Sequence, residues 1–376
     1  MDIQDKSKSE WYYVKNIDAI DSPALIVYQE RVAENIRILI SMTDDVKRLR
    51  PHVKTHKTKE VVELQMEAGI NQFKCATIAE AEMLGIAGAA DVLLAYQPIV
   101  SKVKRLMQLI KNYPATKFSC LVDNIIAAKN ISEFAANKDL MIPVYIDLNV
   151  GMNRTGIEPG NDAIQLYKEC QQLNGIEPVG LHAYDGHIRA TDIEERMIEC
   201  DKAFEPVLLM QQVLIKEGFT EPVIIAGGSP TFPVHVKKKD RQCSPGTFIY
   251  WDRGYQLSFE EQHFLPAALV ITRIISFPGD RKLCLDLGHK SVAAENSLAK
   301  RVYFLNAPGL KFISQSEEHL VVETPSDHSY KIGDVLFGLP VHICPTVALY
   351  ERAYVIENNE VTGEWKTIAR DRKINI

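Results

Sequence analysis

Two stretches, Val-Leu-Leu-Ala-Tyr at residues 92–96 and Val-Ile-Ile-Ala at residues 223–226, decide the class of fold because each is apolar throughout. Strands that are covered on both faces in a parallel sheet have this texture, whereas a strand with one face in water alternates apolar and polar residues. The sequence predicts eight parallel strands. They lie at 46–54, 72–77, 91–96, 117–123, 142–148, 178–184, 222–227 and 247–251.

Segments with helical periodicity separate these strands. In 58–68, apolar residues recur along one stripe and Gly69 stops the helix. Eight strand–helix units that close on themselves form a (β/α)8 TIM barrel of about 250 residues. An open doubly wound sheet is the alternative, but the even repetition of the units favours the barrel. The other helical segments are 78–87, 100–111, 125–137, 161–173 and 193–217.

A different texture begins near residue 265. Short apolar runs are separated there by turn residues such as Gly279-Asp280 and Asn358-Asn359, which is typical of an antiparallel β-domain. The run 24–28 has no helix before it and is a candidate strand of the same domain. We predict an α/β barrel over 22–264 and a C-terminal β-domain over 265–376, to which residues 1–21 are candidates to contribute. The short runs are 268–275, 282–286, 302–304, 319–323, 335–340 and 352–356.

The composition excludes several classes of protein. The chain has 376 residues, with 43 Lys and Arg against 49 Asp and Glu, and 46% of the residues are hydrophobic. That apolar content is too high for a disordered chain, and the charge balance lacks the basic excess of a nucleic-acid-binding protein. No apolar stretch approaches the roughly 18 residues of a membrane span, and the polar start lacks the apolar core of a secretory signal. We expect a cytoplasmic protein without nucleic-acid or membrane partners.

Reactive residues are expected where the strands end, because TIM-barrel sites lie at the C-terminal edge of the sheet. After the run 222–227, Gly227, Gly228, Ser229 and Thr231 let backbone N–H groups approach an anion closely. Phosphate sites in TIM barrels often form in the loops after the last two strands. A tight turn that needs glycine for its backbone angles is the alternative, so this loop alone does not decide the function.

Lys54 ends the first predicted strand, within Arg-Pro-His-Val-Lys-Thr-His-Lys at residues 50–57. A lysine at a barrel mouth can lose its charge through burial and neighbouring cations, and the neutral amine can form a Schiff base with an aldehyde. For a lone lysine, a solvated basic loop is the alternative. A lysine together with a phosphate loop in one barrel indicates pyridoxal phosphate, since that cofactor needs both.

The order of these motifs resembles that of the fold-type III pyridoxal-phosphate enzymes, the alanine racemase group. The motif at 50–57 looks like that of the D-threonine aldolase and D-serine dehydratase family, and the resemblance covers essentially the whole chain. It implies that Lys54 is the catalytic, Schiff-base lysine. Arg154, in Gly-Met-Asn-Arg-Thr-Gly at 151–156, would lie near the phenolic oxygen of the cofactor, and Tyr184 would bond the pyridine nitrogen. The implied phosphate residues are Gly227, Gly228, Ser229 and Thr231, with Gly246 and Tyr250 nearby.

A metal pair is the third feature. None of the 7 cysteines belongs to a CxxC pair, but His342 and Cys344 are two residues apart in a predicted strand. Residues i and i+2 of a strand face the same side, so this imidazole and thiolate can bind one ion, and they suit Zn²⁺. A core cysteine beside an edge histidine is the alternative. The resemblance, which implies a metal pair at a similar place, favours the metal, with Mn²⁺ or Mg²⁺ as alternatives to Zn²⁺.

Other polar residues lie near the predicted mouth. The supporting groups are expected to be His52, His56, His182 and His187, and the candidate partners of the ring or the ligands are Asp147 and Asp252. The histidines expected to be structural are His235, His263, His289, His319 and His328.

With a cofactor and a metal at one site, the resemblance implies a lyase that acts on D-3-hydroxy amino acids. If a metal-bound β-hydroxyl loses its proton, Cα–Cβ can break, which cleaves D-threonine to glycine and acetaldehyde. If the Cα proton leaves to Lys54, the hydroxyl can depart, which dehydrates and deaminates D-serine or D-threonine. An amino-acid racemase is an alternative that needs a second base, and a pyridoxal-phosphate carrier without a β-domain is an alternative of another class. The resemblance also implies a homodimer with a shared active site.

Overall fold

The structure of the protein is a computed structural model that describes residues 9–325 and 328–376, so the expectation for residues 1–8 lies outside the described residues. The chain divides into two compact units. We call Leu39–Lys54, Val62–Gly246 and Asp371–Ile376 the barrel unit. The β unit is the rest of the described chain up to Arg370: residues 9–38, Thr55–Val61 and Thr247–Arg370.

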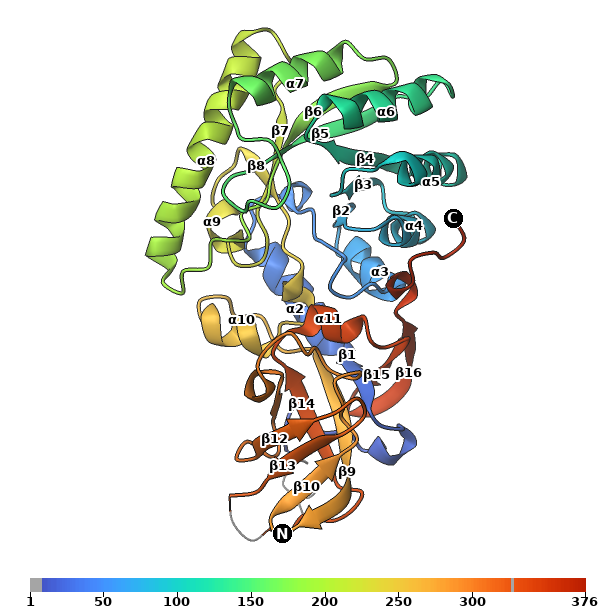
Figure 1. Cartoon of the computed structure of the whole chain (residues 1–376), viewed down its shortest axis with the longest axis vertical. Helices are drawn as coiled ribbons and strands as arrows, with labels where there is room; N and C mark the ends of the chain where they lie inside the picture. Colours follow the sequence, from blue (N-terminus) through green and yellow to red (C-terminus); the bar gives the residue numbers. More distant parts are fainter. Residues whose placement is uncertain (1–8, 326–327) are drawn as a thin grey trace. The chain divides into compact units, whose positions relative to one another are not determined.

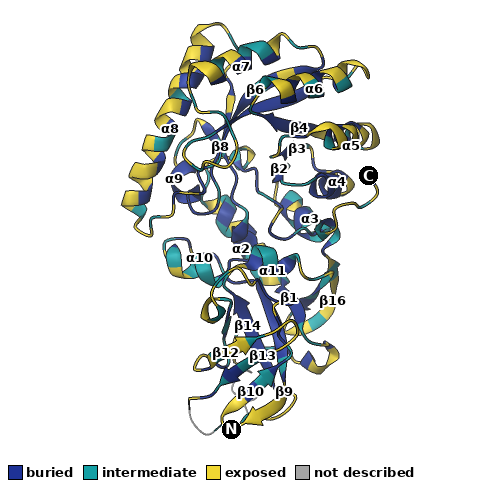
Figure 2. Ribbon diagram, in the orientation of Figure 1, coloured by how far each residue is buried: buried dark blue, intermediate teal, exposed yellow. Residues whose placement is uncertain are grey.

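A parallel sheet of seven strands forms the centre of the barrel unit, and the strands follow in chain order. Its strands are almost entirely buried, as their continuous apolar sequences require. The helices from α4 (Ile78–Ala87) to α8 (Ile193–Lys216) follow one another around the outside of this sheet (Figure 1), and their exposed faces point away from it (Figure 2). The strands are β2 (Gln72–Cys75), β3 (Asp91–Leu94), β4 (Lys117–Val122), β5 (Ile142–Leu148), β6 (Ile176–Ala183), β7 (Val223–Ala226) and β8 (Arg241–Cys243).

The helices begin and end on local sequence signals. In α4, for example, the Thr77 side chain accepts a hydrogen bond from the Glu80 N–H at the start, and Gly88 ends the helix with a φ of 80°. The helices are α2 (Gln29–Ser41), α3 (Lys59–Glu67), α4 (Ile78–Ala87), α5 (Val100–Asn112), α6 (Ile125–Ala136), α7 (Asn161–Gln171), α8 (Ile193–Lys216), α9 (Phe232–His235), α10 (Arg253–Ser258) and α11 (Ile343–Val347).

The predicted TIM-like class is confirmed, but two of the eight predicted strands are wrong. The run 46–54 contains a short 3-10 helix, Val46–Arg48, and then single parallel bridges from Leu49 to Cys243 and from His52 to Lys74. This segment therefore lies between β8 and β2, where an eighth strand would stand. The run 247–251 is a buried turn that begins with the 3-10 helix Thr247–Ile249. Apolar residues fill a buried turn as well as a strand, so apolarity alone could not separate the two.

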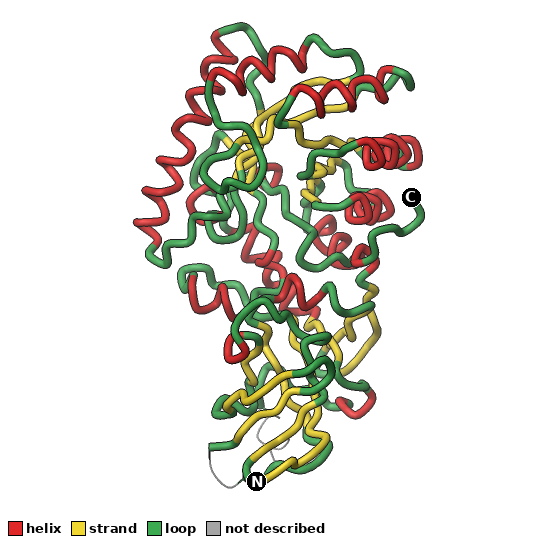
Figure 3. The backbone as a smooth tube through the Cα atoms, in the orientation of Figure 1, coloured by secondary structure: helices red, strands yellow, loops and turns green. Residues whose placement is uncertain are grey.

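The β unit holds a sheet of nine strands in which the predicted strand 24–28 takes a central place. This strand, β1 (Ala24–Tyr28), pairs in parallel with β15 and antiparallel with β9, and Ile26 is fully buried in the core. The other pairs of the sheet are antiparallel, as predicted. Figure 3 shows these strands with their connecting loops. The remaining strands are β9 (Ala268–Gly279), β10 (Lys282–Leu285), β11 (Val302–Phe304), β12 (Lys311–Gln315), β13 (Leu320–Glu323), β14 (Val335–Pro340), β15 (Arg352–Glu357) and β16 (Glu360–Lys366).

Across residues 9–325 and 328–376, no helix combines the length and the apolar character that crossing a lipid bilayer requires.

Candidate active site

The backbone after Leu49 carries Lys54 to the C-terminal edge of the parallel sheet. The Lys74 N–H on β2 donates to the Pro51 carbonyl at 2.8 Å, and the Val53 N–H donates to the Lys74 carbonyl at 2.9 Å. Lys54 follows directly, and it is exposed. The predicted covalent lysine is thus held at a strand end with its amine open to a ligand.

Arg154 and Tyr184 are brought together at the same edge. The guanidinium carbon of Arg154 lies 4.9 Å from the centre of the Tyr184 ring, after β5 and β6 respectively. Stacking of a guanidinium on an aromatic face is favourable and fixes the orientation of both groups. The two residues that the sequence assigned to the ring of the cofactor therefore lie side by side.

The glycine loop after β7 has the close backbone packing that an anion cradle needs. Gly227 has a φ of 65°, and a Cβ atom there would lie 2.6 Å from the Thr231 hydroxyl oxygen. The Gly228 N–H points to that hydroxyl at 3.4 Å. No side chain fits at Gly227, so only glycine allows the backbone of this loop to pack so closely on Thr231 and His235.

A second loop meets the glycine loop. The Gly246 N–H donates to the Ser229 hydroxyl at 3.0 Å, which joins two of the predicted phosphate residues. Nearby in sequence, the hydroxyl of Ser244 is buried without a hydrogen-bond partner among the described residues. Buried polar atoms are almost always paired in native proteins, so an orphan at a loop of this kind is a place for a ligand.

Asp147 and His182 form a buried pair on neighbouring strands. The Nδ1 atom of His182 lies 2.7 Å from Asp147, and its Nε2 atom has no partner among the described residues. Burial lowers the pKa of His182, so the ring is neutral at pH 7 with its proton on Nδ1. Burial alone raises the pKa of Asp147, but the bonds from His182 and other donors outweigh it and lower the pKa. A neutral imidazole with a free Nε2 lone pair can accept a proton or a hydroxyl hydrogen bond.

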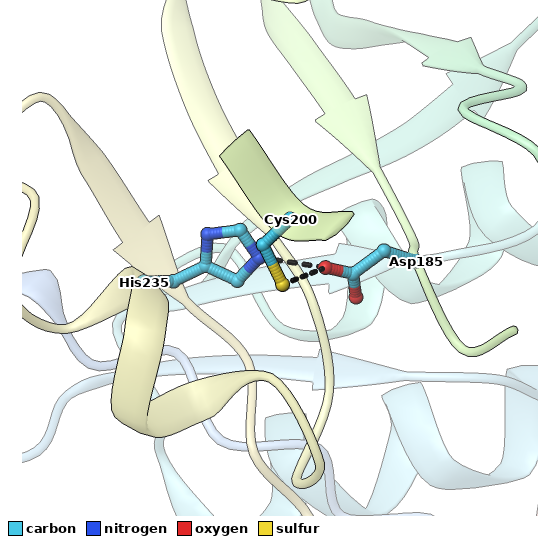
Figure 4. A group of neighbouring side chains, drawn as sticks. All are labelled: Asp185, Cys200 and His235. Carbon is cyan, nitrogen blue, oxygen red and sulfur yellow. Dashed lines mark hydrogen bonds and ion pairs between the residues drawn. The ribbon is translucent and has the colours of Figure 1, made fainter. Parts of the chain in front are cut away.

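Asp185 was missed by the sequence reasoning, although it follows Tyr184 directly. It is fully buried and accepts hydrogen bonds from Thr231 at 2.8 Å and from His235 at 2.7 Å. Cys200, on α8, also points at its carboxylate, and Figure 4 shows the three side chains converging. Burial alone raises the pKa of Asp185, but His235 and Thr231 outweigh it and lower the pKa. Asp185 thus ties the loop after β6 to the glycine loop after β7.

The same three side chains offer donor atoms within 4.8 Å of one another, the only such group of three in the part of the chain that the structure describes. A metal ion needs the thiolate of Cys200, but burial raises the pKa of that thiol strongly. His235 is moreover within 3.3 Å of the Arg241 guanidinium at its other nitrogen. The group therefore fits a hydrogen-bonded brace better than a metal site.

Tyr250, unlike the other predicted cofactor residues, belongs to the β unit. It is buried, its ring centre lies 6.4 Å from that of His56, and burial raises the pKa of its hydroxyl. Its predicted contact with the phosphate stays a prediction.

His342 and Cys344 do not lie in a strand as predicted. Strand β14 ends at Pro340, His342 caps the short helix α11, and Cys344 lies within it. The side chains still meet: a hydrogen bond from the His342 ring to Cys344 is the largest cause that raises the pKa of His342 to about 9. A helical turn therefore brings the two side chains together, where the alternation of a strand was expected to do so.

A carboxylate orients this histidine. Glu295 bonds the Nδ1 atom of His342 at 2.5 Å, which fixes the orientation of the imidazole. Metal-bound histidines commonly donate their second nitrogen to a carboxylate in this way. The Thr55 hydroxyl lies 3.2 Å from the Cys344 sulfur. The imidazole of His342 and the thiol of Cys344 thus meet on a partly exposed surface, and Glu295 orients the imidazole. This arrangement fits a Zn²⁺ ion.

The barrel unit also fits pyridoxal phosphate. It offers an exposed amine at Lys54, an anion cradle at Gly227 and Gly228, and orphaned buried polar atoms at His182 and Ser244. These are the groups that an aldehyde, a phosphate and a ring oxygen require.

Comparisons with known proteins show which families the chain resembles. Residues 27–254 match the family described as "Alanine racemase, N-terminal domain", and residues 267–356 match a "Putative serine dehydratase domain". A D-threonine aldolase from Arthrobacter sp is 27% identical over 366 residues, which cover 93% of this chain and 93% of that protein. A D-serine dehydratase from Dictyostelium discoideum is 22% identical over 400 residues, with 93% and 97% covered.

The chain also resembles solved structures in fold. The crystal structure of D-threonine aldolase from Filomicrobium marinum matches with a TM-score of 0.86 at 24% identity, covering 96% of this chain and 97% of that one. The resemblance expected from the sequence motifs is confirmed.

Proposed function

The chain belongs to the alanine racemase N-terminal domain family, which matches more than half of it, and on this premise we propose that it is a pyridoxal-phosphate- and metal-dependent lyase of D-3-hydroxy amino acids. One combination of observations carries the proposal. The barrel unit holds an amine and an anion cradle, and the β unit holds a histidine–cysteine pair oriented by a carboxylate. Neither a racemase nor a cofactor carrier needs the histidine–cysteine pair.

Each residue has a separate task in this chemistry. When bound, pyridoxal phosphate stabilises negative charge at the substrate Cα. Lys54 holds the cofactor and can accept the Cα proton. His342 and Cys344 would hold the metal, which acts as a Lewis acid on the β-hydroxyl.

Two products follow from two fates of the hydroxyl. If it loses its proton, the Cα–Cβ bond breaks and D-threonine gives glycine and acetaldehyde. If Lys54 takes the Cα proton, the hydroxyl departs as water, and hydrolysis gives a 2-oxo acid and ammonia. The relatives named above include both an aldolase and a dehydratase, so both reactions belong to the proposal.

A product assay with D-threonine and D-serine tests it, with and without a chelator and with Zn²⁺ or Mn²⁺ added back. Glycine plus acetaldehyde identifies an aldolase, and 2-oxo acid plus ammonia identifies a dehydratase. Conversion of the D-isomer to the L-isomer without either product would replace the lyase by a racemase. A yellow protein that turns over neither substrate would indicate a cofactor carrier.

Lys54→Ala tests the covalent lysine. We expect it to abolish turnover and the visible absorbance of the bound cofactor, while Lys57→Ala, in the same loop, keeps both. Full turnover in Lys54→Ala would overturn the assignment.

His342→Ala and Cys344→Ala test the metal pair. We expect both to lose the metal and the activity but to keep cofactor absorbance, and Glu295→Gln to weaken metal affinity by about 10–100-fold. Metal analysis of the purified variants is the measurement. Unchanged metal content in the first two variants would place the ion elsewhere, and the Asp185–Cys200–His235 group is the next position to test.

Zn²⁺ is the ion that we propose, because a thiolate and an imidazole suit it better than Mn²⁺ or Mg²⁺. We also propose a homodimer with a shared active site and a cytoplasmic location. Light scattering of the purified protein tests the homodimer, since a monomeric mass with full activity would contradict it.

A further inference from the structure

Lys74 is a buried amine that neither the proposed mechanism nor the motif analysis uses. It lies on β2 between Phe73 and Cys75, and only 2% of it is exposed. Its Nζ atom makes a single hydrogen bond among the described residues, at 3.5 Å to the carbonyl of Gly227. It has no carboxylate within 4.0 Å in the described chain. A buried ammonium offers three donors and needs an anion, so this one is short of partners.

The amine stands among the residues assigned to the cofactor. Gly227 belongs to the glycine loop, and the Tyr184 ring centre is 5.8 Å from Nζ. The backbone of Lys74 pairs with the residues that immediately precede Lys54. The side chain and backbone of this one residue therefore lie against three separate segments of the candidate site.

The charges around Lys74 do not neutralise it. Burial is the largest cause that lowers its pKa to about 7, and the nearby charge of Lys54 adds to the shift. Asp185 and Asp147 act in the opposite direction, and Arg50 lowers the pKa further. The groups that face Lys74 from the packed elements are Arg50 and Lys54 before β2, Asp147 on β5, His182 on β6, and Tyr184 and Asp185 after it.

We propose that Lys74 is a second amine of the cofactor site, which binds an anionic oxygen of pyridoxal phosphate, so that cofactor binding takes up a proton onto this side chain. The inference rests on the proposed function. The oxygen belongs either to the phosphate or to the phenolate of the ring, because Lys74 contacts the glycine loop on one side and lies near Tyr184 on the other.

The proton uptake follows from linkage. In the free protein Lys74 titrates near neutral pH, and an anion beside it raises its pKa. Above that free pKa the unliganded lysine is neutral and must gain a proton on binding. The affinity for cofactor must therefore fall with rising pH, by about tenfold per pH unit more than in a protein without this amine.

The experiment measures the dissociation constant of pyridoxal phosphate by absorbance titration of the cofactor-free protein between pH 7 and pH 9. Lys74→Met keeps the length of the side chain and removes the charge, and Lys74→Gln is a second variant with a polar end. Lys117→Met is the matched control, since Lys117 is an exposed lysine at the start of β4. We expect wild type and Lys117→Met to share one pH slope, and both Lys74 variants to show a slope smaller by about one unit of log K per pH unit.

Pyridoxal, which lacks the phosphate, separates the two sources of the anion. If the extra slope persists with pyridoxal, the phenolate oxygen is the partner, and if it vanishes, the phosphate is. Equal slopes and affinities in wild type and the Lys74 variants would overturn the inference and leave the proposed function intact. Failure of the wild-type protein to bind the cofactor at all would overturn both.

Discussion

The bond from His182 to Asp147 fixes which imidazole nitrogen carries the proton. Asp147→Asn keeps the shape of the side chain but removes the charge that holds the proton on Nδ1, 2.7 Å away. We expect the Nε2 lone pair to be lost in much of the protein and kcat to fall by about 10²-fold or more, with cofactor affinity largely kept. Steady-state kinetics against Asp162→Asn, an exposed aspartate on α7, is the measurement. Unchanged kcat would show that His182 has no part in the reaction.

His56 makes the stability of the protein depend on pH. It is buried, its Nδ1 accepts from the Thr58 N–H at 3.2 Å, and burial is the largest cause that lowers its pKa to about 3. The folded pKa lies below the unfolded value near 6.5, so the stabilisation is complete above pH 6.5 and is lost as pH falls toward 3.

The expected size of that loss is up to about 1.4 kcal/mol per pH unit between pH 6.5 and pH 4, because the unfolded chain binds one more proton there. Urea unfolding at several pH values measures it. His56→Asn should flatten the dependence, whereas His263→Asn, at an exposed position, should leave it unchanged. A curve of the same steepness in His56→Asn would assign the pH dependence to another group.

At the scale of elements, the turn after β7 tests whether the glycine loop is built for a ligand. Gly227 and Gly218 both have positive φ, at 65° and 92°, but a Cβ at Gly227 meets Thr231 and His235, and a Cβ at Gly218 meets nothing within 4 Å. We expect Gly218→Ala to cost about 1 kcal/mol and to keep cofactor affinity. Gly227→Ala should cost about 2–4 kcal/mol and weaken cofactor binding.

Urea unfolding and cofactor titration of the two variants separate the effects. Equal loss of stability without loss of cofactor affinity would reduce the loop to an ordinary tight turn.

Elements whose sequence signal is local were predictable. The helix 78–87 and the strands 24–28, 302–304 and 335–340 have the predicted bounds, because periodicity and turn residues mark their ends. The run 247–251 was not predictable, since its apolar residues are buried in a turn. Apolar residues indicate that a segment is buried, but not whether its backbone is a strand or a turn. Strands β12 and β16 were missed because they are largely exposed and lack an apolar run.

Candidate site residues could be named from the sequence where they belong to a motif, but not where packing brings together residues that are far apart in the chain. His342 and Cys344 lie close together at the start of a helix and not in the predicted strand, since a helical turn and a strand both bring such residues together. Glu295 is 47 residues away in sequence, and no spacing rule connects it to His342. Lys74 could have been noticed in the sequence, because it lies inside a predicted buried strand and a lysine is almost never fully buried without a charged or polar partner.

The strand β1 links the start of the chain to the C-terminal sheet, and this decides which parts of the molecule can fold alone. It pairs with β9 on one side and β15 on the other, and Ile26 is fully buried among Leu269 and Ile271. A fragment of residues 265–376 would leave both flanking strands with unpaired edges and an open core. We expect that fragment to be unfolded or aggregated, because hydrogen bonds and apolar burial are lost together at the centre of the sheet.

A synthetic peptide of residues 21–30 should restore structure to the fragment when it is added in trans, since it supplies the missing strand between two preformed partners. The same peptide with Ile26→Lys should fail, because a charge at that fully buried position cannot be neutralised. Circular dichroism and urea unfolding with each peptide measure the effect. Cooperative unfolding of the fragment without any peptide would show that β1 is dispensable, and that the predicted boundary at residue 265 marks an autonomous domain.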